Sequence, residues 1–241
     1  MGFWRNLADA ALDLVYPPCC VACGAVLPFG QTEAVCGICA KLLPNAPEQV
    51  CVVCGRERHE EPEICEDCRT EQFAFTHCFT LYPYTDVVSG MILRYKSGGH
   101  PAAAKGLAAL LHARFPKESL PDVDIILPVP GHARKNRARG FSQTALLAHA
   151  YTALCGLRFD GETLFAARET QKQSSLRAEE RRLNVQNAYA VRNPAAVAGQ
   201  TVLVLDDVFT TGATMDACAK ALKNAGAKEV YGIVIAASLR E

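Results

Sequence analysis

The sequence has no excess of charge of either sign, because 25 lysines and arginines balance 25 aspartates and glutamates among its 241 residues. Bulk charge therefore gives no reason to expect a protein that binds nucleic acid or a membrane surface. No apolar run approaches the length of a transmembrane helix, and the amino terminus lacks the apolar core of a signal peptide. These absences predict a cytoplasmic protein without a transmembrane segment.

Apolar residues make up half of the chain, which is enough for a full hydrophobic core and argues against disorder. The first segment, residues 1–16, has apolar side chains at helical spacing, among them Phe3, Leu7 and Leu14. This pattern predicts a short amphipathic helix. Because the segment carries little positive charge, we expect it to pack on its own protein rather than on a membrane.

Eight of the twelve cysteines form four Cys-x-x-Cys pairs in the first third of the chain. Two such pairs complete a tetrahedral zinc site, and four sulfur ligands leave no open position, so such sites are structural. A disulfide framework is the rival interpretation, but it needs an oxidising compartment that nothing here suggests. The repeat favours pairing of neighbours, although a crossed pairing stays open. The predicted ligands are Cys20, Cys23, Cys36, Cys39, Cys51, Cys54, Cys65 and Cys68.

The remaining cysteines, Cys19, Cys78, Cys155 and Cys218, are expected to be small core residues. Residues 17–75 are thus predicted to form a double zinc ribbon, repeated at a period near 30 residues. Residues 76–241 change to alternating strand and helix patterns. This alternation predicts an α/β domain with a doubly wound, mainly parallel sheet.

The most informative segment is Thr201–Thr214, a strand of β-branched and leucine residues followed by Asp206 and Asp207 and then by a small hydroxyl-rich loop. In open α/β sheets ligands bind beyond the carboxyl ends of the strands. A loop of this composition at a helix start is suited to a phosphate monoester. Helix capping alone explains one aspartate or threonine but not the whole set. The loop residues are Thr210, Thr211, Gly212, Ala213 and Thr214.

A second segment follows the short strand at residues 124–127. After Val129 and Pro130 it gathers Arg134, Lys135, Arg137 and Arg139 without a nearby acid. A solvated basic loop is the simpler interpretation, but its place after a strand and opposite a phosphate loop favours pyrophosphate binding. A third, polar segment over residues 168–189 is a candidate lid.

The segment Thr201–Thr214 resembles the phosphoribosyl pyrophosphate (PRPP) signature of type I phosphoribosyltransferases. The whole chain resembles the ComF family, in which a double zinc ribbon precedes such a domain and some members are linked to DNA uptake. The family pattern is represented by Pro128-Val-Pro130, His132, Arg134-Lys135 and Arg139-Gly-Phe-Ser-Gln143. Ser142 replaces the usual asparagine, and Ser175 and Asn187 stand where glycine is common.

The resemblance implies that Asp206 and Asp207 contact the ribose hydroxyls, that the loop 210–214 wraps the 5′-phosphate, and that Mg²⁺ accompanies PRPP. It implies catalytic roles for Asp206, Asp207 and Arg139, leaving-group contacts for Arg134 and Lys135, and PRPP contacts for Val129, Pro130 and Lys96. Lys96 begins the hood segment, residues 96–100, where the acceptor would be recognised.

The first functional hypothesis is a transferase that moves the phosphoribosyl group to an unidentified nitrogen acceptor. The alternatives are a non-catalytic PRPP-sensing regulator, since fold does not guarantee turnover, and an adaptor of the transformation machinery that binds single-stranded DNA or competence proteins. The ribbon segment from Cys19 to Cys68 holds more acids than bases, which argues against a DNA footprint there.

Overall fold

The computed structural model describes residues 18–28, 30–31, 33–45, 47–58, 63–98, 101–131, 142–168, 185 and 187–238. The predicted helix over residues 1–16 lies outside these ranges. No helix in the described part of the chain is both long and apolar enough to cross a bilayer.

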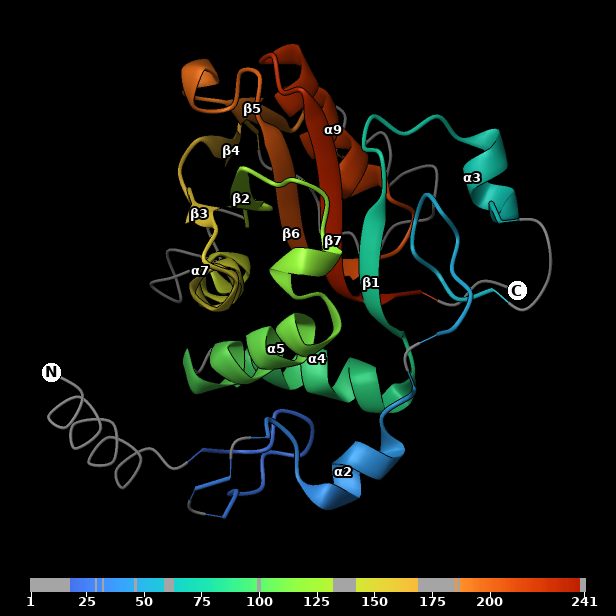
Figure 1. Cartoon of the computed structure of the whole chain (residues 1–241), viewed down its shortest axis with the longest axis vertical. Coiled ribbons are helices and arrows are strands. Elements are labelled where there is room, and N and C mark those ends of the chain that lie inside the picture. Colours follow the sequence, from blue (N-terminus) through green and yellow to red (C-terminus); the bar gives the residue numbers. More distant parts are fainter. Residues whose placement is uncertain are drawn as a thin grey trace, which may run out of the picture.

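The centre of the molecule is a five-stranded sheet in the order β1-β7-β6-β2-β3, and every neighbouring pair in it is parallel (Figure 1). The strands are β1 (Cys78–Pro83), β2 (Ile125–Pro128), β3 (Arg158–Phe159), β6 (Thr201–Phe209) and β7 (Glu229–Ala237). A separate antiparallel pair is formed by β4 (Leu164–Ala166) and β5 (Tyr189–Val191). The predicted parallel α/β fold is confirmed.

Helices cover both faces of this sheet. One face carries α4 (Asp86–Gly98), α5 (Pro101–Arg114) and α7 (Gln143–Cys155), and the other carries α9 (Ala213–Asn224). Short helical turns are α2 (Gly37–Leu42), α3 (Glu66–Thr70), η1 (Lys117–Ser119) and η3 (Pro194–Ala196).

The central strands are apolar on both sides because each side meets a different core. In β6, Leu203 and Leu205 pack with α4, α5 and α7, whereas Val202 and Val204 pack with α9. All four side chains are fully buried. Successive residues of a strand point to opposite faces, so a strand covered on both faces has no polar alternation.

The switch point of the sheet, where the chain connections turn to opposite sides, lies between β2 and β6. The chain passes from β2 through α7 to β3 on one side, and from β6 through α9 to β7 on the other. In an open parallel sheet, a ligand crevice lies at such a switch point beyond the carboxyl ends of the strands. This is the position of Val129 after β2 and of Asp206 near the end of β6.

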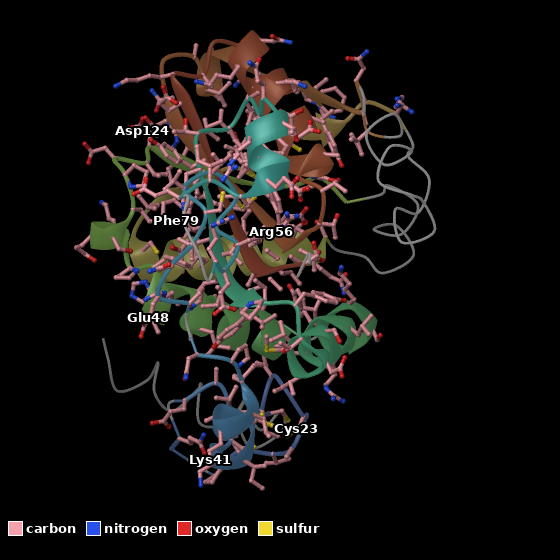
Figure 2. The ribbon with its side chains drawn as sticks, turned by 90° about the vertical axis from the view of Figure 1, so that its right-hand side faces the viewer. Cys23, Lys41, Glu48, Arg56, Phe79 and Asp124 are labelled. Atoms are coloured by element: carbon pink, nitrogen blue, oxygen red, sulfur yellow. The ribbon has the colours of Figure 1, made fainter. Side chains whose placement is uncertain are left out.

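The two cysteine-rich repeats dock at different places, one beside α4 and α5 and the other along β1 (Figures 1 and 2). We call residues 18–45 the first ribbon and residues 47–72 the second ribbon. In the first, the Ala22 carbonyl accepts from Arg94 Nε at 3.1 Å. In the second, the Val53 carbonyl accepts from Cys78 N at 2.8 Å, and the Cys54 carbonyl accepts from Thr80 Oγ1 at 3.2 Å.

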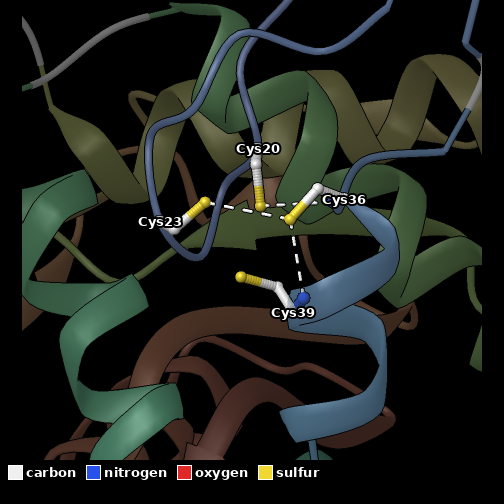
Figure 3. Close-up of side chains that lie close together, drawn as sticks. All are labelled: Cys20, Cys23, Cys36 and Cys39. Carbon is white, nitrogen blue, oxygen red and sulfur yellow. Dashed lines mark hydrogen bonds between the residues drawn. The ribbon is translucent and has the colours of Figure 1, made fainter.

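Each ribbon brings four cysteine sulfurs within 4.8 Å of one another, Cys20, Cys23, Cys36 and Cys39 in the first (Figure 3) and Cys51, Cys54, Cys65 and Cys68 in the second. The Sγ atoms of Cys23 and Cys36 are 3.9 Å apart, and those of Cys54 and Cys65 are 3.7 Å apart. A tetrahedral site with Zn–S bonds of about 2.3 Å has sulfur–sulfur edges of about 3.8 Å. Both clusters therefore fit zinc, with the cysteine pairs joined as neighbours.

Three of the four remaining cysteines, Cys78, Cys155 and Cys218, are buried as expected, but Cys19 is exposed. The prediction of a core position for Cys19 is wrong. Cys19 forms a β-bridge with Val26, and the next residue, Cys20, belongs to the metal cluster. Neighbouring side chains in extended backbone point to opposite sides, so Cys19 cannot face the cluster as well.

The repeat allows a matched test of ribbon docking. Gly24 and Gly55 both have positive φ, 79° and 68°, but a Cβ on Gly55 would lie 2.1 Å from the Cys78 carbonyl oxygen, whereas one on Gly24 would lie 3.6 Å from Arg94 Cδ. We expect Gly24→Ala to lower the free energy of unfolding by about 1 kcal/mol, the cost of a left-handed alanine. Gly55→Ala should cost about 2 kcal/mol more, because β1 must move. Urea denaturation measures both, and equal losses would contradict this docking.

A second test concerns the metal. We expect the purified chain to hold two zinc ions, one for each of the two cysteine clusters. Because zinc binding drives the folding of small thiolate sites, strong chelation should lower the melting temperature and expose eight reactive thiols. Metal analysis and thiol titration measure this. Disulfides found by mass spectrometry in freshly reduced and refolded protein would contradict it.

Candidate functional site

Two adjacent carboxylates lie at the carboxyl end of the sheet. The register pairs Leu205 of β6 with Pro128, the last residue of β2, so Asp206 and Asp207 extend beyond β2 at the switch point. The backbone N–H of Asp207 donates to Asp206 Oδ1 at 2.8 Å, which fixes the orientation of the first carboxyl group. The predicted pair of acids is thus held in place by β6, a central strand of nine residues.

The electrostatics of this pair are unusual. Burial raises the pKa of Asp206 to about 7, and the charge of Asp207 adds to the effect. Lys96 Nζ forms an ion pair with Asp207 Oδ2 at 2.8 Å. Burial opposes the charge on Lys96, but the Asp207 carboxylate outweighs it, so the pKa of Lys96 lies above its usual value. The site therefore holds one ammonium group and a proton that is easily lost near neutral pH.

Gln143 holds Lys96 from behind. The side-chain Nε2 of Gln143 donates to the backbone carbonyl oxygens of Tyr95 and Lys96 at 2.9 and 2.7 Å. The backbone carbonyl oxygen of Gln143 accepts from Tyr95 Oη at 2.6 Å. Gln143 begins α7, where Ser142 Oγ caps the helix by accepting from Ala145 N. Serine and asparagine are both good N-cap residues, which explains why serine is tolerated here. The role of Gln143 was not predicted, although it belongs to the quoted sequence pattern.

The loop from Thr210 to Thr214 turns tightly into α9. Gly212 has φ +79°, and a Cβ there would lie 2.7 Å from the Phe209 ring and 2.9 Å from the Phe73 ring, so glycine is required on both grounds. The helix that follows directs the N–H groups of its first turn and its positive dipole end toward the loop. A hollow at this place is lined by Asp206, Val208, Phe209, Thr210, Gly212, Ala213, Thr214, Met215 and Val234.

The antiparallel pair β4–β5 adds one residue to the neighbourhood of the loop. Tyr189 of β5 is close to Thr214, and burial raises the pKa of its phenol. Asn187, just before β5, has φ 55°. Asparagine is one of the few residues that tolerate this left-handed conformation. The need for it explains why glycine is common at this position in the pattern that the sequence resembles.

The other predicted site residues are only partly within the described chain. Val129 N donates to the Leu205 carbonyl at 2.8 Å, the Val129 carbonyl accepts from Thr144 Oγ1 at 2.7 Å, and Pro130 follows, half-buried. Arg134, Lys135 and Arg139 lie outside the described residues, as do Arg137, the segment 169–184 of the candidate lid and residues 99–100 of the hood.

Comparison with known domains finds two matches. Residues 11–69 match the double zinc ribbon domain, and residues 146–240 match the phosphoribosyl transferase domain. Among solved structures, an adenine phosphoribosyltransferase is 16% identical and aligns over 62% of this chain and 75% of its own, but its TM-score of 0.35 is too low to add to the fold assignment.

Relatives align over most of their length. They include the DNA utilization protein YhgH of Escherichia coli O6:H1, 29% identical over 90% of this chain and 96% of its own. Competence protein F of Haemophilus influenzae is 25% identical over 88% and 93%, and competence protein ComFC of Bacillus subtilis is 26% identical over 80% and 80%. With both domains in this order, the predicted family is confirmed, and the chain belongs to the ComF/YhgH family, which joins a double zinc ribbon to a phosphoribosyltransferase domain.

Proposed function

We propose that the chain binds PRPP at the switch point and transfers its phosphoribosyl group to a nitrogen nucleophile. The observation that carries this proposal is the arrangement at the end of β6, where Asp206 lines one hollow with residues of the loop 210–214 and Asp207 follows Asp206 in the strand. Carboxylates accept hydrogen bonds from the vicinal hydroxyls of a ribose. The loop and the N-terminus of α9 favour a phosphate dianion. The carboxylates thus suit a sugar, and the loop suits its 5′-phosphate.

Mg²⁺ fits this donor set as the companion of PRPP. Hard oxygen ligands from Asp206, Asp207 and the sugar are the kind that Mg²⁺ prefers, and it is usually shared between carboxylates and substrate phosphates. When bound, the ion would neutralise the pyrophosphate and so weaken the bond to this leaving group. Zinc, in contrast, is proposed to be structural, because four sulfurs fill each cluster.

The reaction follows from these positions. The nitrogen nucleophile forms a bond to the anomeric carbon as the bond to pyrophosphate breaks, and the positive charge that develops on the sugar is stabilised by Asp206 and Asp207. Arg139, Arg134 and Lys135 would receive the departing pyrophosphate. No covalent nucleophile is needed, so the contribution of the protein is orientation and electrostatics.

The central prediction is that PRPP binding depends on Mg²⁺ and on both acids. Each of Asp206→Asn and Asp207→Asn should weaken PRPP binding by about 10- to 100-fold, because asparagine has nearly the shape of aspartate but lacks its charge. Isothermal titration calorimetry measures the affinity. The control is Asp122→Asn, an exposed acid before β2, at the opposite end of the sheet. Equal affinity in all four proteins would refute the site.

Turnover separates an enzyme from a sensor. A transferase releases pyrophosphate when the correct acceptor is present, and the release disappears in Asp207→Asn. A sensor is stabilised thermally by PRPP but releases no pyrophosphate with any amine or base tested. The acceptors to be screened are amines and nitrogen bases, because the attacking atom of the proposed reaction is nitrogen.

The second prediction concerns pH. Asp206 has a pKa of about 7 before the ligand binds, and the ligand requires its charged form. Affinity for Mg²⁺–PRPP should therefore rise by about twofold between pH 7 and pH 8.5, where the ionisation of Asp206 is completed. The second ionisation of a phosphate monoester lies near pH 6 and is complete in this range. Proton release on binding, measured in buffers of different ionisation enthalpy, checks the sign; proton uptake at pH 7 would contradict it.

A link to DNA is supported by the names of relatives, which are described as DNA utilization and competence proteins. We place this link second and attribute it to a role alongside PRPP binding. Direct binding of single-stranded DNA should weaken steeply with salt and should weaken further when Arg134, Lys135 and Arg137 are neutralised. Parallel titrations with PRPP and with DNA separate this role from the first.

A further inference from the structure

Arg56 of the second ribbon is a buried cation that reaches the loop 210–214. It is 8% exposed, and its Nη1 donates to Asp67 Oδ2 at 2.7 Å. Its Nη2 donates to the carbonyl oxygen of Thr210, the first residue of the loop. The guanidinium carbon lies 5.4 Å from the centre of the Phe209 ring. Figure 2 shows Arg56 beside the sheet, well away from Cys23 and Lys41 of the first ribbon.

Both members of the ion pair are fixed by the second metal cluster. Arg56 follows the ligand Cys54 by two residues, and its carbonyl accepts from the N–H of the ligand Cys51 at 2.8 Å. Asp67 lies in α3 between the ligands Cys65 and Cys68. The position of the guanidinium group is therefore determined by the backbone that surrounds the metal.

The loop is held from the same side by further contacts. The rings of Phe73 and Phe75, which follow the second ribbon, lie 6.5 and 6.0 Å from the Phe209 ring. The backbone N–H of Ala74 donates to Asp216 Oδ1 in the first turn of α9 at 2.8 Å. The outer side of the loop is thus covered by the second ribbon and its exit segment, which leaves the inner side for an anion.

The first ribbon shows that a ribbon does not need this ion pair. In the repeat, Ala25 stands where the second ribbon has Arg56, and Ile38 stands where it has Asp67. The local backbone is the same, since Cys20 N donates to the Ala25 carbonyl at 2.8 Å. Ile38 is 75% exposed. The Arg56–Asp67 pair is therefore found only in the second ribbon, and the second ribbon is the one that contacts the loop 210–214.

Energetics argue against a merely structural role for Arg56. Burying a guanidinium group is costly unless all its donors are paired, and Arg56 Nε has no hydrogen-bond partner among the described residues. Its charge stands directly behind the Thr210 peptide group. A positive charge at this place, with little water between, favours a dianion in front of the loop.

We propose that Arg56 is a positioning residue for the phosphate loop, and that it makes the affinity of the loop depend on the metal in the second cluster but not on the metal in the first. This inference rests on the proposed function, because it takes the loop as the site of the 5′-phosphate. Since coupling between two sites is reciprocal, a phosphate ester on the loop must tighten metal binding in the second cluster by the same factor.

The test uses the full-length, zinc-loaded protein and two probes, ribose 5-phosphate and PRPP. We expect Arg56→Ala and Asp67→Asn to weaken binding of both by about tenfold, the usual effect of losing a charged hydrogen bond, while the zinc content stays unchanged. Arg56→Lys keeps the charge but cannot bridge Asp67 and Thr210, and should recover part of the affinity. The matched control is Ile38→Asn in the first ribbon, which should leave both affinities unchanged.

A second readout does not depend on activity. Competition with a chromogenic chelator gives the zinc affinities of the two clusters. Ribose 5-phosphate should raise the zinc affinity of the second cluster by about tenfold, because the coupling is reciprocal, and should leave that of the first unchanged. The increase should vanish in Arg56→Ala. If Arg56→Ala does not fold, Asp67→Asn and Arg56→Lys decide the question.

The outcomes separate the two proposals. If the wild-type protein binds neither ribose 5-phosphate nor PRPP, the proposed function fails and this inference fails with it. Suppose instead that the wild-type protein binds both probes, and that the variants have a lower melting temperature but unchanged affinities for the probes. If the zinc affinities also do not change when ribose 5-phosphate is added, Arg56 is structural and only this inference is overturned.

Discussion

The site depends on the enforced closeness of two carboxylates in a poorly solvated place. Asp206 and Asp207 are consecutive residues of one strand, so neither can move away from the other without breaking β6. Their repulsion is met by Lys96 on one side and by a retained proton on the other. A ligand that brings cations and hydroxyl groups would relieve this repulsion, so the two carboxylates favour such a ligand. The surrounding contacts from α4 and α7 serve to keep the compensating ammonium in place.

The ribbons differ in what they contribute, although they share one pattern. The first packs on α4 and α5, where a Cβ added to Gly106 would lie 2.4 Å from Val21, so the contact is close and apolar. The second packs on β1 and on the loop 210–214 through charged and aromatic groups. The two ribbons thus share one cysteine arrangement, and Arg56 and Asp67 give the second ribbon a contact with the loop 210–214.

Much of this could be read from the sequence, for physical reasons that differ between parts. The cysteine spacing identified both clusters, because two-residue gaps restrict how thiolates can meet a metal. The unbroken apolar run before Asp206 identified a strand buried on both faces. The role of Gln143 could not be deduced, because a single amide side chain has no periodicity and its partners are backbone carbonyls distant in sequence. Arg56 was missed for a similar reason, since it looks like an ordinary charged residue beside a ligand until Thr210 and Phe209 are placed next to it.

The pairing of the sheet also has a consequence for synthesis of the chain. In the part of the sheet that the structure describes, β1 at residues 78–83 pairs with β7 at residues 229–237, which itself lies between β1 and β6. A nascent polypeptide can therefore present the first strand long before its partner leaves the ribosome, and contacts so distant along the sequence form slowly. During that interval the edge of β1 is unpaired, and metal binding by the cysteine clusters would order the amino-terminal part before the sheet is complete.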